Sequence, residues 1–126
     1  MILPLITFII IPFGFSIPDS YHKCWEVVAS YSHESKIIYL CEWVTGNKEF
    51  YKQHEIGHYV WFNILTNEQR AKYKVEFNKS TVFYREYSKN LEEDFADNYA
   101  LLQIKERQTY QLQKRINLIR KYIWEL

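Results

Sequence analysis

The chain has no excess of charge of either sign, few cysteines and no repeated segments. Its 126 residues include 16 Lys and Arg against 15 Asp and Glu, a net charge of +1. Proteins that bind nucleic acid usually carry a basic surplus, so this balance argues against nucleic acid as a partner. Because no internal repeat or low-complexity segment is present, we expect a single domain without linkers, and 48% hydrophobic residues suffice for one small core.

The only cysteines are Cys24 and Cys41. Their spacing matches no zinc-ligand pattern. Both lie in segments that we expect to be extended. In an exported protein they can form one disulfide across a pair of strands, whereas in a cytoplasmic protein they are small buried apolar residues. The bridge is therefore tied to the location of the protein.

The first eighteen residues contain no charged side chain. Gly14 and Ser16 stand in the small-x-small arrangement that signal peptidases accept, although no basic residue precedes the apolar run. We predict that residues 1–16 are a signal peptide or apolar leader, and that residues 17–126 form one domain that is secreted or located in the periplasm or cell envelope. An uncleaved anchor, the chain's only expected contact with a membrane, and a buried N-terminal element of a cytoplasmic protein remain alternatives.

The pattern of apolar residues predicts an α+β fold. Residues 25–31 and 36–44 are rich in β-branched and aromatic side chains and predict a β-hairpin. Helices are expected from about 48 to 63 after an Asn47 cap, from a capping box at Thr66 to about 77, and after Asn90. Residues 81–89 fit either a short strand or an irregular connection. The last expected helix, at about 104–126, has an apolar stripe made of Ile104, Leu112, Ile116, Ile119, Ile123 and Leu126.

The first of these helices contains the pattern H-E-x-x-H at His54, Glu55 and His58. Histidines four residues apart project from one helix face and can bind one metal ion. Gly57, just before the second histidine, lets a neighbouring backbone approach. A catalytic zinc takes three protein ligands and leaves one position for water. No H-x-x-G-x-x-H continuation follows and the other histidines lie upstream, which excludes the metzincin arrangement.

A carboxylate pair on a later helix offers the missing ligand. Glu93 and Asp97 are four residues apart and share a helix face. This spacing allows Glu93 to bind the metal while Asp97 accepts a hydrogen bond from a ligand histidine. Two alternatives stay open. Glu93 can instead close a capping box with Asn90, and Glu92 or Asp94 can be the ligand.

The segments H-E-I-G-H at residues 54–58 and E-D-F-A-D at residues 93–97 resemble the paired signatures of lethal-factor-like gluzincin peptidase domains. In size the chain is similar to minigluzincins, which are minimal zinc peptidases, and the resemblance covers about residues 25–102. It implies a small zincin-like α+β fold: a short antiparallel sheet or hairpin, then an active-site helix, a glutamate helix and a C-terminal helix.

The resemblance also implies the roles of individual residues. His54, His58 and Glu93 would hold zinc, with Glu55 as general base and Asp97 supporting a ligand histidine. Tyr87 matches the tyrosine that stabilises the oxyanion, although it precedes Glu93 by six residues rather than the expected seven. An ordinary buried tyrosine is the alternative for this position.

These features predict a zinc-dependent metalloendopeptidase that acts on peptides or proteins. In folds of this type the strand before the active-site helix borders the cleft, so we expect residues 36–44 to pair with an extended substrate. The alternative is a latent or non-catalytic metal-binding protein. Its C-terminal helix would then block the cleft, or mediate self-association or binding to a partner or a membrane surface.

Overall fold

A mixed β-sheet precedes all the helices. The computed structural model describes residues 5–42 and 48–125, and this part of the chain contains three strands, in the order β1-β3-β2, and four α-helices. β2 (Ala29–Ser32) and β3 (Ile37–Cys41) form an antiparallel hairpin, and β1 (Thr7–Ile11) pairs with the other side of β3 in parallel. The α+β class and the hairpin are confirmed, whereas the expectation of a purely antiparallel sheet is wrong.

Strand β1 lies inside the segment predicted to be a leader. Thr7 pairs with Ile37 and Ile11 with Cys41. Apart from Thr7 the strand is apolar, so it lacks the alternation that identifies a strand with one buried face. Four of its five side chains are exposed and only Ile11 is buried. Cleavage after Ser16 would remove this strand from the sheet, and whether such cleavage occurs stays a prediction.

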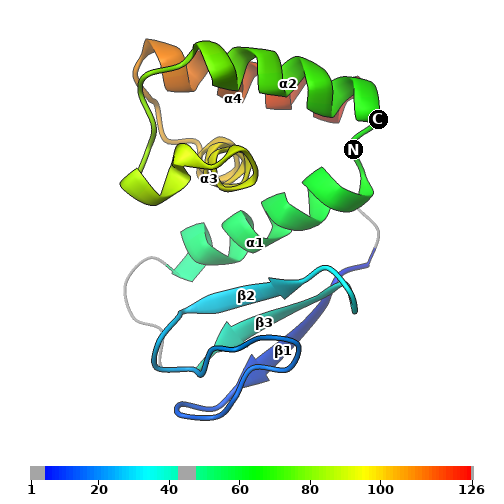
Figure 1. Cartoon of the computed structure of the whole chain (residues 1–126), viewed down its shortest axis with the longest axis vertical. Helices are drawn as coiled ribbons and strands as arrows, with labels where there is room; N and C mark the ends of the chain where they lie inside the picture. Colours follow the sequence, from blue (N-terminus) through cyan, green and yellow to red (C-terminus); the bar gives the residue numbers. More distant parts are fainter. Residues whose placement is uncertain (1–4, 43–47, 126) are drawn as a thin grey trace.

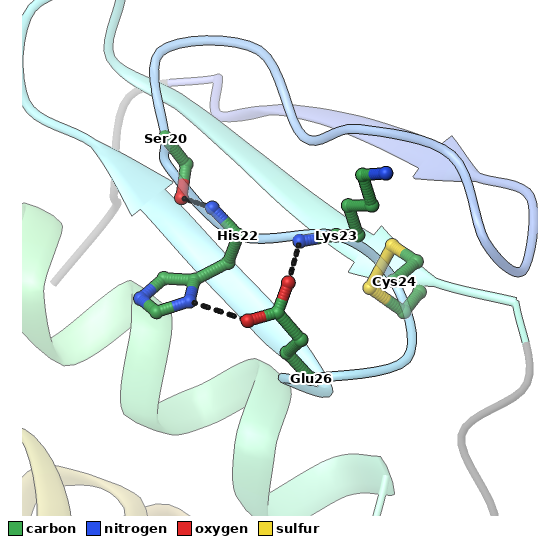
Figure 2. The surroundings of a disulfide bond; sticks show 6 residues. Ser20, His22, Lys23, Cys24 and Glu26 are labelled. Atoms are coloured by element: carbon green, nitrogen blue, oxygen red, sulfur yellow. Dashed lines mark hydrogen bonds and ion pairs between the residues drawn. A yellow bond between two sulfur atoms is a disulfide. The ribbon is translucent and has the colours of Figure 1, made fainter.

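The two cysteines form the disulfide that the sequence allows. Cys24 and Cys41 are joined, with their Cα atoms 5.3 Å apart. Cys24 lies in the connection before β2 rather than in a strand, and its backbone N–H donates to the carbonyl of Phe15. Both cysteines are buried, with Ile11 and Ile17, in a small apolar cluster. The disulfide therefore anchors the connection before β2 to the end of β3 (Figure 2).

The helices largely follow the predicted boundaries. They are α1 (Lys48–Asn63), α2 (Asn67–Lys79), α3 (Leu91–Ile104) and α4 (Tyr110–Glu125). A short 3-10 helix, η1 (Glu86–Lys89), lies in residues 81–89, for which the sequence allowed a strand or an irregular connection. The capping box of α2 is confirmed, because the Thr66 hydroxyl accepts from the Gln69 N–H and the Gln69 side chain accepts from the Thr66 N–H. The Asn47 cap, the strand end at Val44 and Leu126 lie outside the described residues.

Helix α1 lies between the sheet and the other three α-helices (Figure 1). The main core joins these layers, and its buried residues include Ile38, Val60, Trp61, Tyr73, Phe95, Tyr99 and Ile119. Three residues of the C-terminal stripe, Leu112, Ile116 and Ile119, are buried, with Ile119 in this core and Ile116 in a second cluster. Ile104, however, belongs to α3, which ends where Lys105 adopts a left-handed conformation with φ 59°. None of the described helices is long and apolar enough to span a bilayer.

A buried ion pair binds α4 to α3. Arg115 is 1% exposed, and its Nε and Nη2 donate to the two carboxylate oxygens of Asp94 at 2.9 and 3.0 Å. The hydroxyl of Tyr73 on α2 donates to the same carboxylate at 2.7 Å. Asp94 thus links three helices, and both of its carboxylate oxygens accept hydrogen bonds in doing so.

Candidate metal centre

Two histidines of α1 and one carboxylate of α3 converge on one point. The Nε2 atoms of His54 and His58 are 3.1 Å apart. Glu93 Oε2 lies 2.9 Å from His54 Nε2, and Glu93 Oε1 lies 3.1 Å from His58 Nε2. Ligand atoms at about 2.0–2.1 Å from a tetrahedral zinc are separated from one another by about 3.3 Å. The three side chains therefore already have nearly the spacing that a zinc ion requires.

The hydrogen bonding of His54 leaves a place for a cation. Its Nδ1 is 2.7 Å from Asp97 Oδ1, and because a carboxylate only accepts, Nδ1 carries the hydrogen. In a neutral ring Nε2 then presents a lone pair to Glu93 Oε2, a buried atom to which no other described residue donates a hydrogen bond. A lone pair and a carboxylate oxygen at 2.9 Å need a metal ion or a proton between them.

The acid–base properties of the cluster agree with this need. Burial lowers the pKa of His54, but its hydrogen bonds with Asp97 and Glu93 outweigh burial and raise the pKa to about 9. Burial would raise the pKa of Glu93, but the hydrogen bonds with His54 and His58 prevail and hold it well below its usual value. Without a metal the site therefore retains a proton, which a metal ion must displace.

Glu55 lies beside this point without being its closest carboxylate. The ligand atoms of His54, Glu55 and His58 lie within 4.8 Å of one another, a group that can hold a metal ion. Glu55 is 8% exposed and lies in the wall of a cleft. Burial raises its pKa, while the nearby His54 and His58 and a backbone hydrogen bond from Tyr31 of β2 act in the opposite direction. It is thus a carboxyl group with a raised pKa next to a candidate metal position.

Asp97 is fully buried and accepts hydrogen bonds from three residues. Besides His54 these are Arg85, through Nε at 2.9 Å and Nη2 at 2.6 Å, and the hydroxyl of Ser88. Burial would raise the pKa of Asp97, but the bonds with His54 and Arg85 lower it, so the carboxylate stays ionised. Sequence reasoning missed Arg85 and Ser88, because nothing in an irregular connection indicates which helix its side chains will contact.

A glycine allows the two site helices to meet. A Cβ atom at Gly57 would lie 2.9 Å from the Cα of Ala96 and 3.1 Å from the Cβ of Tyr99, which is too close for any side chain. The close backbone approach predicted for Gly57 is therefore confirmed. This close approach brings the face of α1 that carries His54 and His58 next to the face of α3 that carries Glu93 and Asp97.

The alternatives for the carboxylate ligand can now be compared. Asn90 caps α3, since its side-chain oxygen accepts from the N–H groups of Glu92 and Glu93 at 3.0 and 3.3 Å. The Glu93 carboxylate is directed to the histidines rather than back to the cap. Asp94 is bound to Arg115, and Glu92 is exposed. Of these three carboxylates, Glu93 is the one that contacts both His54 and His58.

The centre opens into a cleft of about 490 Å³. Its walls come from residues 26–31, which include most of β2, and from α1, η1 and the start of α3, and none of the described side chains of α4 lines it. The segment 36–44 was expected to border the cleft, but its described part, residues 36–42, contributes no lining residue, so for these residues the expectation is wrong. β3 is hydrogen-bonded on both sides, because β1 occupies the edge that a simple hairpin would leave open. Within residues 5–42 and 48–125, the strand that lies at the cleft and pairs along one edge only is β2.

Tyr87 and two further histidines also line the cleft. Tyr87 is 65% exposed rather than buried, and it forms a side-chain hydrogen bond with Glu93. Burial and the charges of Glu93 and Glu55 raise its pKa, so the phenol keeps its proton at neutral pH. His22 pairs with Glu26 at 3.6 Å on the connection anchored by the disulfide (Figure 2), and His33 lies 4.5 Å from the ring of Phe62. Neither histidine belongs to the convergent group.

No family model, curated protein or solved structure matches this chain significantly. The functional argument therefore rests on the motif residues and on the geometry of the centre.

Proposed function

We propose that this chain is a zinc-dependent metallopeptidase of the gluzincin type with a zincin-like fold. His54, His58 and Glu93 hold the zinc ion, and Glu55 is the general base. The observation that carries this proposal is the position of Glu93, whose two oxygens face the two Nε2 atoms at 2.9 and 3.1 Å. Glu55 remains next to them in the cleft wall.

The donor set favours a catalytic over a structural zinc. Structural sites are usually closed by four protein ligands, often cysteines. Both cysteines here are in the disulfide. Two imidazoles and one carboxylate leave one position for water, which is the composition of many hydrolytic zinc sites. A structural role would also leave Glu55 as a buried carboxyl group without a task.

The chain's own residues supply the proton transfers of peptide hydrolysis. A bound zinc ion contributes Lewis acidity, which lowers the pKa of a water molecule to about 7. Glu55 accepts the proton of the attacking water and passes it to the leaving amine, and a raised pKa suits a group that must do both near neutral pH. Asp97 keeps the hydrogen of His54 on Nδ1, so that Nε2 points to the metal. Tyr87 donates its hydroxyl hydrogen to the developing oxyanion.

The free edge of β2 is the proposed position of the peptide substrate. Residues 29–31 line the cleft, and β3 occupies only one edge of their strand. An extended peptide can therefore add to the sheet as a further strand, held by main-chain hydrogen bonds. This mode of binding suits a segment within a longer chain, as an endopeptidase requires. The disulfide supports secretion or a location in the cell envelope, because such bonds persist in oxidising compartments.

The alternative of a latent or non-catalytic protein gains little from the position of α4. The side chains described in this helix, residues 110–123, do not line the cleft, and Leu112, Ile116 and Ile119 of its apolar stripe are buried. An inhibitory role would require α4 to leave α3, which breaks the pair between Arg115 and Asp94. Association through the stripe would require the same rearrangement.

The proposal is tested by zinc content and peptide hydrolysis in two variants. Glu55→Gln should keep the zinc and lose about 10²–10⁴-fold in kcat, the usual contribution of general acid–base catalysis. Glu93→Ala should lose zinc. Glu68→Gln, an exposed position on α2, is the control and should behave as the native chain. Native hydrolysis in Glu55→Gln would overturn the mechanism, and zinc bound as tightly by Glu93→Ala as by the native chain would overturn the ligand assignment.

A further inference from the structure

Arg85 lies at the junction of three elements of the centre. It precedes η1, lines the cleft and has a side chain that is 31% exposed. Its guanidinium donates through Nε to one oxygen of Asp97 and through Nη2 to the other. Asp97 in turn accepts the hydrogen of His54 Nδ1. Arg85 is therefore one hydrogen-bonded residue away from a proposed metal ligand.

The same guanidinium is placed against two aromatic rings. Its central carbon lies 5.5 Å from the centroid of the Phe50 ring and 5.5 Å from that of the Tyr87 ring. Phe50 is buried in the first turn of α1, four residues before His54, whereas Tyr87 is exposed at the cleft. A planar cation at this distance attracts each ring and restricts its orientation. Arg85 thus contacts the helix of the histidines, the helix of Glu93 and the tyrosine.

We propose that Arg85 is a positioning residue of this centre, which orients Asp97 for His54 and supports the ring of Tyr87 beside Glu93. This inference rests on the proposed function. In this role Arg85 acts through these two residues rather than directly on zinc or on the substrate.

The geometry requires arginine rather than any cation. The two donors form a fork that holds both carboxylate oxygens, so Asp97 cannot rotate away from His54. The flat face of the guanidinium remains available for the two rings. Lysine offers a compact ammonium on a flexible stem, which can bond one oxygen but cannot hold both oxygens in a fork or stack as a plane. Arg85→Lys therefore keeps the charge and removes the positioning.

A second arginine, which joins two helices away from the cleft, offers a matched control. Arg115 also donates a fork to a buried aspartate of α3, Asp94, but it does not line the cleft. Arg115→Lys should lower the midpoint of thermal unfolding and leave the zinc affinity and kcat of the folded protein unchanged. Arg85→Lys should weaken zinc binding about 10–100-fold, the usual effect of losing a group that supports a ligand. It should also lower kcat with little change in KM.

Two double variants separate the two contacts of Arg85. If Arg85 acts on zinc through Asp97, then Arg85→Lys should weaken zinc binding no further in an Asp97→Asn background. If it supports Tyr87, then Arg85→Lys should lower kcat less in a Tyr87→Phe background than in the native chain. Zinc affinity is measured by competition with a chelating indicator, and kcat and KM with a fluorogenic peptide. Arg85→Ala with millimolar guanidinium provides a second test, in which the added ion should restore zinc affinity.

The outcomes distinguish this inference from the proposed function. If the native chain is active and Arg85→Lys has the same zinc affinity and kcat, only the role of Arg85 is overturned, and the proposed function stands. Equal losses in Arg85→Lys and Arg115→Lys would show a general effect on folding and would also overturn it. A native chain that takes up no zinc would overturn the proposed function and this inference together.

Discussion

Removal of α4 separates a structural role of this helix from an inhibitory one. A chain that ends at Glu106 lacks Leu112, Ile116 and Ile119, each buried in the native core. Burial of one such side chain is worth about 1.5–3 kcal/mol, so the three together contribute about 5–9 kcal/mol. Loss of Arg115 leaves Asp94 as a buried carboxylate without its cation, which costs about 3–5 kcal/mol more. The total approaches the whole stability of a domain, about 5–15 kcal/mol.

We therefore expect the shortened chain to be unfolded and inactive. Circular dichroism should show loss of helix well beyond the residues removed, and protease digestion should be rapid. Arg115→Met in the full-length chain is the milder companion. It should lower stability by about 3–5 kcal/mol in urea unfolding while the cleft of the folded fraction keeps its zinc. A shortened chain that stays folded and hydrolyses peptides faster than the native chain would refute this reasoning and support self-inhibition.

Two further predictions concern the centre itself. Gly57→Ala should be destabilised by about 1–3 kcal/mol, because the new Cβ would meet the backbone of Ala96 at 2.9 Å, and this cost outweighs the gain of at most about 1 kcal/mol in helix propensity. The variant should also bind zinc more weakly. A variant that is more stable than the native chain and keeps its zinc affinity would contradict the close packing of α1 on α3. The pKa of His54 is raised from 6.5 to about 9, so metal-free protein should lose stability as the pH rises from about 6.5 through 9, while zinc affinity rises over the same range. Calorimetry in buffers of different ionisation enthalpy should detect at least about one proton released per zinc at pH 7.5, because His54 gives up its proton and zinc-bound water, with a pKa of about 7, adds a further fraction. Zinc uptake without proton release would show that His54 is neutral before binding.

The helices and the hairpin were predictable because their signals are local. Thr66 and Gln69 close their capping box within one turn, and the spacing of His54 and His58 places both on one face of any helix. The pairing of Glu93 with these histidines was predictable only as one of several choices, since Asn90, Glu92 and Asp94 offered reasonable alternatives. The contacts that distinguish Glu93 from Glu92 and Asp94 depend on the positions of Arg115 and of the histidines, which belong to other helices.

Strand β1 illustrates the opposite case. Residues 8–11 are uniformly apolar, and a run of this kind is compatible with a leader, an anchor or a strand. Its pairing with β3 joins residues 30 positions apart in the sequence, which no local pattern encodes. This pairing decides which strand keeps a free edge, and so it moves the expected substrate edge from β3 to β2.

The motif H-E-x-x-H of α1 is the part of this protein that the sequence by itself determined, together with the glycine that lets α3 approach. Helical periodicity alone places the two histidines on one face, so no tertiary contact is needed to predict a metal site there. The tertiary structure decided which carboxylate lies against the two histidines, which residues hold Asp97 beside them and where the cleft opens. Arg85, Ser88 and Arg115 find their aspartates across distances of 9 to 21 residues in sequence. Such contacts depend on how the helices pack, and only the folded chain specifies them.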